Sequence, residues 1–206
     1  ILALFFYSSL GGQGAGRWAV ESSSAASFFL CSQTDLKWVE VNSTDKIPTH
    51  ALLATDSQPF DESRSEGTAL SLLSLDTKAQ LLCENPALLQ VKNSRQANSS
   101  ASLLAGSLQV TSHDQQHQFI TPLFRVLSKG ARYRIEVIRS PDWQPITRKE
   151  IQMNSKTWVL PALVTVVAVA IYVWQADDGP VQVIKDGQVH ELEEGEQLTM
   201  GRDGEV

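Results

Sequence analysis

The chain has 206 residues and a mass of 22.6 kDa, of which 42% are hydrophobic and 19% charged. Its 23 acidic and 17 basic residues give a formal net charge of -6, which argues against a nucleic-acid-binding protein, because such proteins need a basic face for phosphates. The length fits one ordinary domain with or without a tether, and the apolar content argues against a wholly disordered chain.

The first segment, residues 1–7, is an apolar run, and small residues follow it up to Gly16. An apolar run followed by small residues is typical of the end of a secretory signal or of a membrane anchor. A buried strand is the alternative for the same pattern. We expect residues 1–30 to be an export signal or membrane-anchor remnant with a Ser- and Ala-rich leader.

From residue 31 onward, short apolar stretches alternate with turn residues. Asp186 and Gly187 lie between two alternating runs, which is the strongest short-range signal for a hairpin. Turn signals at about ten-residue spacing predict an all-β domain over residues 31–206, with many short antiparallel strands in a sandwich or solenoid-like arrangement. The main predicted strands are 36–41, 68–75, 78–83, 88–91, 107–110, 118–120, 123–127, 132–137, 181–184 and 189–192, whereas 93–102 is predicted as a loop.

A second apolar block covers residues 158–174 and carries no charge. Trp at both of its ends resembles a membrane aromatic belt, and its length is near the lower limit for a spanning helix. Its β-branched residues and its continuous apolar character instead fit a strand that is buried on both faces. Periodicity does not choose between a buried strand and a transmembrane helix, so both remain open.

Few residues suggest reactive chemistry. His113 and His117 would share one face of a helix, but the sequence places them at a polar hairpin tip without a third ligand, which favours solvation over a metal site. No local signature selects a nucleophile and its base, so we expect no catalytic residues, no metal and no cofactor, and a secreted hydrolase is disfavoured. Cys31 and Cys83 are the two cysteines, and in an exported domain they could form one disulfide; two buried thiols are the alternative.

Four segments carry a recognisable order of short motifs. Residues 103–110 (LLAGSLQV) contain a strand interrupted at Gly, and 119–122 (FITP) contain a Thr-Pro step. Residues 126–137 (VLSKGARYRIEV) alternate after a Gly, and 181–197 run from Val-Gln-Val to Gly-Glu-Gln. In this order the motifs resemble the FecR-type periplasmic domain, the ferric-citrate regulator family. The resemblance covers roughly residues 34–206.

The resemblance implies a non-catalytic protein of the bacterial cell envelope. Members of the family relay signals from outer-membrane transporters or serve as β-rich modules of envelope proteins. We therefore expect a periplasmic, inner-membrane-associated domain that binds another envelope protein in signalling or regulation. The alternative is a single-pass membrane component of a larger envelope assembly, such as secretion, pilus or motility machinery, in which 158–174 spans the membrane.

The expected contact surface lies around residues 132–149. Trp, Tyr and Arg are the residue types enriched at the energetic centres of protein interfaces. This region concentrates them, although the same side chains could simply solvate an outer strand face. The predicted partner-binding residues are Arg132, Tyr133, Arg134, Arg139 and Trp143.

Overall fold

The computed structural model describes residues 18–22, 28–31, 38–41, 46–47, 51–55, 70–75, 77–83, 87–92, 100–139, 166–201 and 204–205. Within these ranges the regular structure consists of β-strands alone, so the all-β prediction is confirmed. The strands are β1 (Trp18–Ser22), β2 (Phe28–Cys31), β3 (Trp38–Val41), β4 (Lys46–Ile47), β5 (Ala51–Thr55), β6 (Leu70–Ser74), β7 (Gln80–Cys83), β8 (Leu88–Lys92), β9 (Ser100–Thr111), β10 (His117–Ile120), β11 (Arg125–Ser128), β12 (Ala131–Arg139), β13 (Val166–Ala176), β14 (Val181–Lys185), β15 (Gln188–Leu192), β16 (Gln197–Gly201) and β17 (Gly204–Glu205).

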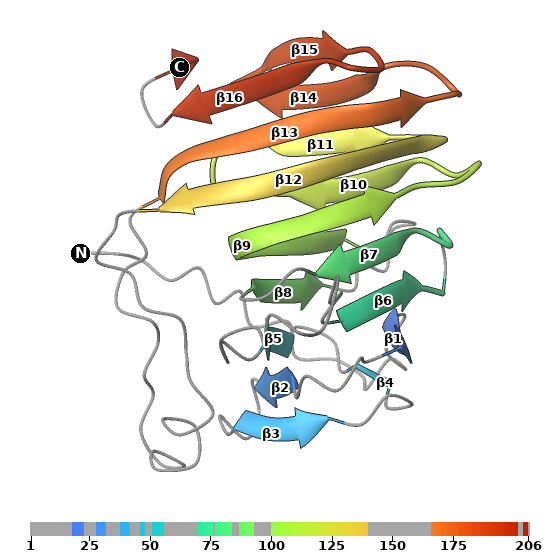
Figure 1. The fold of residues 1–206 in the computed structure, drawn as a ribbon, viewed down its shortest axis with the longest axis vertical. Helices are drawn as coiled ribbons and strands as arrows, with labels where there is room; N and C mark the ends of the chain where they lie inside the picture. The colour runs from blue at the N-terminus through green and yellow to red at the C-terminus, as the bar shows by residue number, and fades with distance from the viewer. Residues whose placement is uncertain are drawn as a thin grey trace, which may run out of the picture.

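The strands stack into two layers along the long axis of the molecule (Figure 1). Layer A runs β4, β1, β6, β7, β9, β12, β13, β16, β17. Layer B runs β3, β2, β5, β8, β9, β10, β11, β14, β15. Neighbouring strands are antiparallel throughout the described pairs, except that β10 is parallel to β9. In the described residues the outermost strands, such as β3 and β15, leave the layers open at their ends.

Strand β9 belongs to both layers and joins them. Its first half, residues 100–105, pairs with β8 and β10, whereas its second half, residues 106–111, pairs with β7 and β12. The change of layer occurs at Gly106, whose φ of 90° lies in a region that favours glycine over all other residues. Strand β9 begins at Ser100, so the prediction of a loop over 93–102 is wrong for residues 100–102.

A single main core fills the space between the layers. Alternate residues of β12 point inward, and Tyr133, Ile135 and Val137 are buried, while Arg132 and Glu136 are exposed. The same period places Val181 and Val183 of β14 in the core from the other layer. The two layers are therefore held together by apolar side chains that alternate with outward-facing ones on each strand.

The predicted leader is partly folded. Residues 18–22 and 28–31 form β1 and β2, and Trp18 is fully buried in the core. Strand β1 pairs with β4 and β6, which lie far along the chain, so local pattern alone did not identify it. Residues 1–17, which carry the expected export or anchor run, lie outside the described residues.

The second apolar block is a strand where the structure describes it. Residues 166–174 belong to β13, which pairs with β12 and β16, while 158–165 lie outside the described residues. Val169, Ile171 and Val173 are fully buried, but Tyr172 and Trp174 are exposed, so the expectation of burial on both faces is wrong. Among the described residues, no helix is long and apolar enough to cross a membrane.

The predicted hairpin at Asp186 and Gly187 is confirmed. The two residues have φ values of 51° and 83°, as a type I′ turn requires, and they connect β14 to β15. Lys185 and Gln188 form the strand pair that flanks this turn. The register of β15 is thereby fixed relative to β14.

Candidate functional site

Two aromatic side chains stand on the outer face of layer A. Tyr172 and Trp174 of β13 are 36% and 37% exposed, and their rings contact edge to face with centroids 5.9 Å apart and an interplanar angle of 75°. Tyr172 lies opposite Arg134 of β12 on one side and Gln197 of β16 on the other. We call Arg132, Arg134, Tyr172 and Trp174 the aromatic–arginine patch.

Alternation along β13 places Trp174 on the same outer face as Tyr172, and a β-bulge lies at Trp174. Arg132 pairs with Gln175 and Tyr133 pairs with Val173, so Trp174 is an extra residue with no opposite number on β12. A bulge of this kind increases the local twist of a strand and changes the direction of its side chains. The patch combines a partly exposed aromatic pair with the guanidinium groups of β12.

The arginines of the patch are held differently. Arg132 is exposed, whereas Arg134 is half-buried and its Nη2 donates to Oγ of Ser107, 3.4 Å away on β9. Glu136, also exposed, follows two residues later on the same face of β12. Arg132 and Arg134 thus place positive charge beside the aromatic pair.

The structure brings only part of the predicted contact surface together. Arg132 and Arg134 lie on the outer face, as predicted, but Tyr133 is fully buried and is not a surface residue. Its hydroxyl accepts a hydrogen bond from Oγ of buried Ser128 at 3.2 Å, and burial raises the pKa of the phenol. The side chain of Arg139 and all of Trp143 lie outside the described residues.

The two histidines at the predicted tip have different environments. His113 is exposed in the turn between β9 and β10, but His117 is fully buried, so the prediction of a solvated tip is wrong for His117. Within the described ranges no group of three or more His, Cys, Asp or Glu side chains could hold a metal ion. The side chains of His113 and His117 do not share a face, because His113 lies in a turn and His117 begins strand β10.

His117 joins a small polar cluster in the core. Its Nδ1 lies 3.2 Å from Oγ1 of Thr77, which donates to Oγ of Ser74 at 3.0 Å. The ring also meets Trp18 edge to face at a centroid distance of 6.1 Å. Burial lowers the pKa of His117 from 6.5 to about 4, so the ring is neutral near pH 7.

This hydroxyl–imidazole pair resembles the first two members of a nucleophilic triad. Thr77 and His117 are only 1% and 0% exposed, however, so no substrate reaches the pair without opening the core. Among the described residues, the Nε2 of His117 and the Nε1 of Trp18 have no hydrogen-bond partner, and no carboxylate is bonded to the imidazole ring. The cluster therefore acts in packing the two layers.

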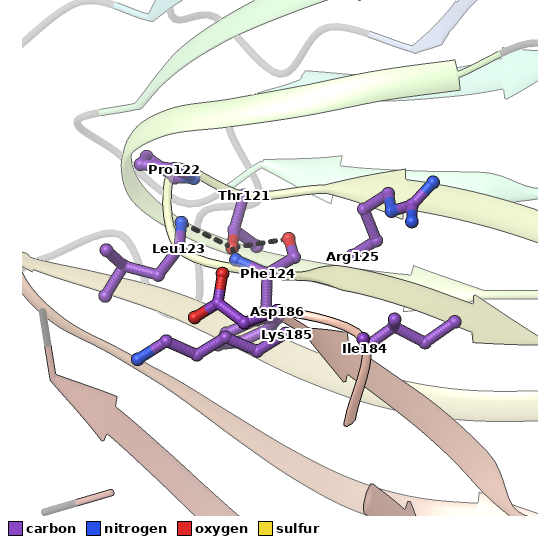
Figure 2. Close-up of a pocket in the computed structure, with 9 residues that line it drawn as sticks. Thr121, Pro122, Leu123, Phe124, Arg125, Ile184, Lys185 and Asp186 are labelled. Atoms are coloured by element: carbon purple, nitrogen blue, oxygen red, sulfur yellow. Dashed lines mark hydrogen bonds between the residues drawn. The ribbon is translucent and has the colours of Figure 1, made fainter. Parts of the chain in front are cut away.

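A shallow hollow of about 310 Å³ lies at the turn end of layer B (Figure 2). Its walls are the turn between β10 and β11 and the turn between β14 and β15. Oγ1 of Thr121 accepts from the backbone N–H groups of Leu123 and Phe124 and donates to the carbonyl of Phe124, which closes the first turn. The lining residues are Thr121, Pro122, Leu123, Phe124, Arg125, Ile184, Lys185, Asp186 and Gly187.

This hollow offers little for chemistry. Asp186 is its one carboxylate, and the Nζ of Lys185 is engaged with the carbonyl of Gly201 at 2.9 Å. The turn amides of Leu123 and Phe124 are used by Thr121, so they are not directed at a ligand. The hollow is best explained as the gap between two adjacent turns.

The Cys31–Cys83 disulfide allowed by the sequence is not formed, since Cys83 is a buried thiol in β7 of layer A. Cys31 lies in β2 of layer B, which is separated from β8 by β5. Strands β7 and β8 both pair with β9, so Cys83 of β7 lies level with β8 in the stack. Cys31 is therefore displaced from Cys83 by two strand spacings along the stack, about 10 Å, and by one spacing between layers, roughly another 10 Å. That separation exceeds the reach of a disulfide.

No family model matches the chain, and no curated protein matches it.

Proposed function

We propose that this chain is a non-catalytic, FecR-type β-domain of the bacterial cell envelope that binds another envelope protein through the aromatic–arginine patch. The single observation that carries the proposal is the exposed, edge-to-face pair of Tyr172 and Trp174 beside Arg132 and Arg134. Aromatic and arginine side chains contribute most of the binding free energy at many protein interfaces. We place the domain in the periplasm, associated with the inner membrane.

The FecR-type interpretation is supported by where the sequence motifs fall. The Gly of residues 103–110 lies at the point where β9 changes layers, and the Thr-Pro step closes the turn between β10 and β11. Gly130 precedes β12, and the closing motif at 181–197 covers the hairpin of β14 and β15. A shared strand between continuously stacked layers favours a solenoid-like description over a sandwich of separate sheets.

The partner's chemistry follows from the charges on the patch. Arg132 and Arg134 lie on the same face as the aromatic pair, at the end of β12 where it pairs with β13. A segment that carries a carboxylate opposite these guanidinium groups and an apolar side chain against Tyr172 and Trp174 complements both features. We therefore infer that the partner presents an acidic segment with interspersed apolar residues.

Site-specific photocrosslinking in the native host tests this proposal. A photoreactive phenylalanine analogue at Tyr172 is expected to give one discrete adduct, because it replaces a ring in the patch. The same analogue at Arg125, an exposed position on β11 of layer B, is the matched control and is expected to give none. Arg132→Glu is expected to abolish the Tyr172 adduct by reversing the charge that the partner meets.

Two results contradict the proposal. One is the absence of an adduct at Tyr172 in folded protein, and the other is an adduct at Tyr172 that persists unchanged in Arg132→Glu. Trp174→Ala is expected to weaken partner binding in a folded protein, because Trp174 is partly exposed and its loss leaves the buried core intact. Urea unfolding of each variant provides the folding control.

A further inference from the structure

Strand β15 (Gln188–Leu192) lies at one end of layer B. In the described part of the chain it pairs with β14 and with no other strand. Figure 1 shows it at the opposite end of the stack from β3. With respect to the described strands, the other side of β15 is therefore an open sheet edge, and such an edge can accept a further strand.

The register of the hairpin identifies which backbone groups face the open edge. Lys185 and Gln188 flank a two-residue turn, so they form a hydrogen-bonded pair, and the pairs then alternate along the ladder. Val189 and Glu191 consequently belong to non-hydrogen-bonded pairs with Ile184 and Gln182. Their N–H and C=O groups point away from β14, toward the open edge.

The side chains around this edge are acidic. Glu191 is exposed and accepts a hydrogen bond from Nε2 of Gln182 at 3.1 Å, which holds its carboxylate on the outer face. The turn after β15 adds exposed Glu193, Glu194 and Glu196, and a carboxylate oxygen of Glu196 accepts the N–H of Glu193 at 2.8 Å. The lysine of the hairpin, Lys185, is bonded to the carbonyl of Gly201.

One further exposed group is apolar. Val189 is 54% exposed, the largest exposure among the described large hydrophobic residues, and its side chain lies on the same face as that of Glu191. An added strand would pack one side chain against Val189 and place another opposite Glu191. The edge thus provides backbone donors and acceptors, an apolar contact and negative charge in one row.

We propose that β15 is a docking edge for an extended, basic segment of a partner protein, which adds to layer B as its next strand. The main-chain groups of Val189 and Glu191 supply the hydrogen bonds, and Lys or Arg side chains of the segment face Glu191 and the acidic turn. The edge of β15 lies in layer B and the aromatic–arginine patch in layer A, although the acidic turn adjoins the patch, since Gly195 and Glu196 are hydrogen-bonded to Val173 of β13. The inference uses none of the patch residues. Charged residues also protect edges from pairing, and the experiment distinguishes the two roles.

Binding of a synthetic peptide of about eight alternating Val and Lys residues tests the proposal. Fluorescence anisotropy with the full chain is expected to show saturable binding that weakens with salt, whereas the matched peptide of alternating Val and Glu does not bind. Val189→Pro is expected to weaken binding about tenfold, because it removes an edge N–H without removing a bond to β14. Val189→Thr keeps that N–H and is the matched control.

Glu191→Lys provides a readout that misfolding does not imitate. This variant is expected to weaken binding of the Val–Lys peptide and to narrow its preference over the Val–Glu peptide, because one carboxylate of the edge becomes an ammonium group while those of the acidic turn remain. Absence of saturable binding of the Val–Lys peptide, or equal binding by Val189→Pro and wild type, overturns the proposal. Self-association of the wild type that is lost in Val189→Pro assigns the edge to a second copy of the chain and also overturns it.

Discussion

The Nδ1 of His117 lies 3.2 Å from the Oγ1 of Thr77, a residue 40 positions earlier in the chain. His117 begins β10 in layer B, and Thr77 lies in the turn between β6 and β7 of layer A. Trp18 of β1 packs its ring edge to face against the same imidazole. One neutral imidazole therefore connects three elements that the sequence keeps far apart.

The first prediction concerns the pH dependence of stability. The pKa of His117 is about 4 in the folded protein and near 6.5 when unfolded, so the unfolded chain binds more protons between these values. The stabilisation from keeping His117 neutral is complete above about pH 6.5 and is lost as the pH falls toward 4. Over that window the free energy of unfolding is expected to decrease by up to about 3 kcal/mol from this residue.

Urea unfolding from pH 4 to pH 7 measures this effect. His117→Gln is expected to flatten the decrease relative to wild type, although it lowers stability at pH 7. His113→Gln is the matched control, because His113 is exposed, and it should leave the decrease unchanged. Equal slopes in wild type and His117→Gln would show that His117 does not cause the acid sensitivity.

The second prediction concerns Tyr133 of β12. Tyr133→Ala is expected to lower the free energy of unfolding by about 3–5 kcal/mol, because it opens a cavity in the core. Tyr133→Phe removes only the hydroxyl that accepts from Ser128 and is expected to cost about 1 kcal/mol. Denaturant midpoints at constant slope measure both values.

Arg132 is the control for this series. It is adjacent in sequence but exposed, so Arg132→Ala is expected to change stability by no more than about 0.5 kcal/mol. If Arg132→Ala and Tyr133→Ala destabilise equally, the assignment of Tyr133 to the core is incorrect.

The sequence predicted the strands whose signals are local. The alternation of β12 and the Asp-Gly turn before β15 both depend on neighbouring residues, and both predictions held. The same alternation, applied strictly, places Tyr133 inward once Arg132 and Arg134 point outward. The sequence-based prediction placed Tyr133 on the contact surface because Tyr is common at interfaces, although the two-residue period of the strand points its side chain inward.

Other features depend on contacts that no local pattern reveals. Strand β1 is defined by pairing with β4 and β6, and β9 changes layer because strands from distant segments occupy its two halves. The sequence predicted the two arginines of the aromatic–arginine patch, which lie on β12, but not its aromatic pair, which lies on β13. Periodicity missed that pair because β13 is apolar on both faces, so no contrast marked its outer side.

The third prediction concerns the turn between β10 and β11. Thr121→Val removes the oxygen that accepts from the amides of Leu123 and Phe124, and is expected to destabilise by about 1–3 kcal/mol. Thr121→Ser keeps that oxygen and loses one methyl group, so it should cost about 0.8 kcal/mol or less. Thermal unfolding of the two variants compares them, and an equal loss in both would assign the effect to the methyl group.

The last prediction concerns the cysteines. Because the register keeps Cys31 and Cys83 beyond the reach of a disulfide, the unreduced protein is expected to contain two thiols. In folded protein the fully buried Cys83 should react slowly with iodoacetamide, and it should react rapidly in denaturant. Mass spectrometry of unreduced, denatured protein is expected to show two added groups for the wild type and one for Cys83→Ala. A wild-type chain that gains no group until a reductant is added would contradict the register of β2 or β7.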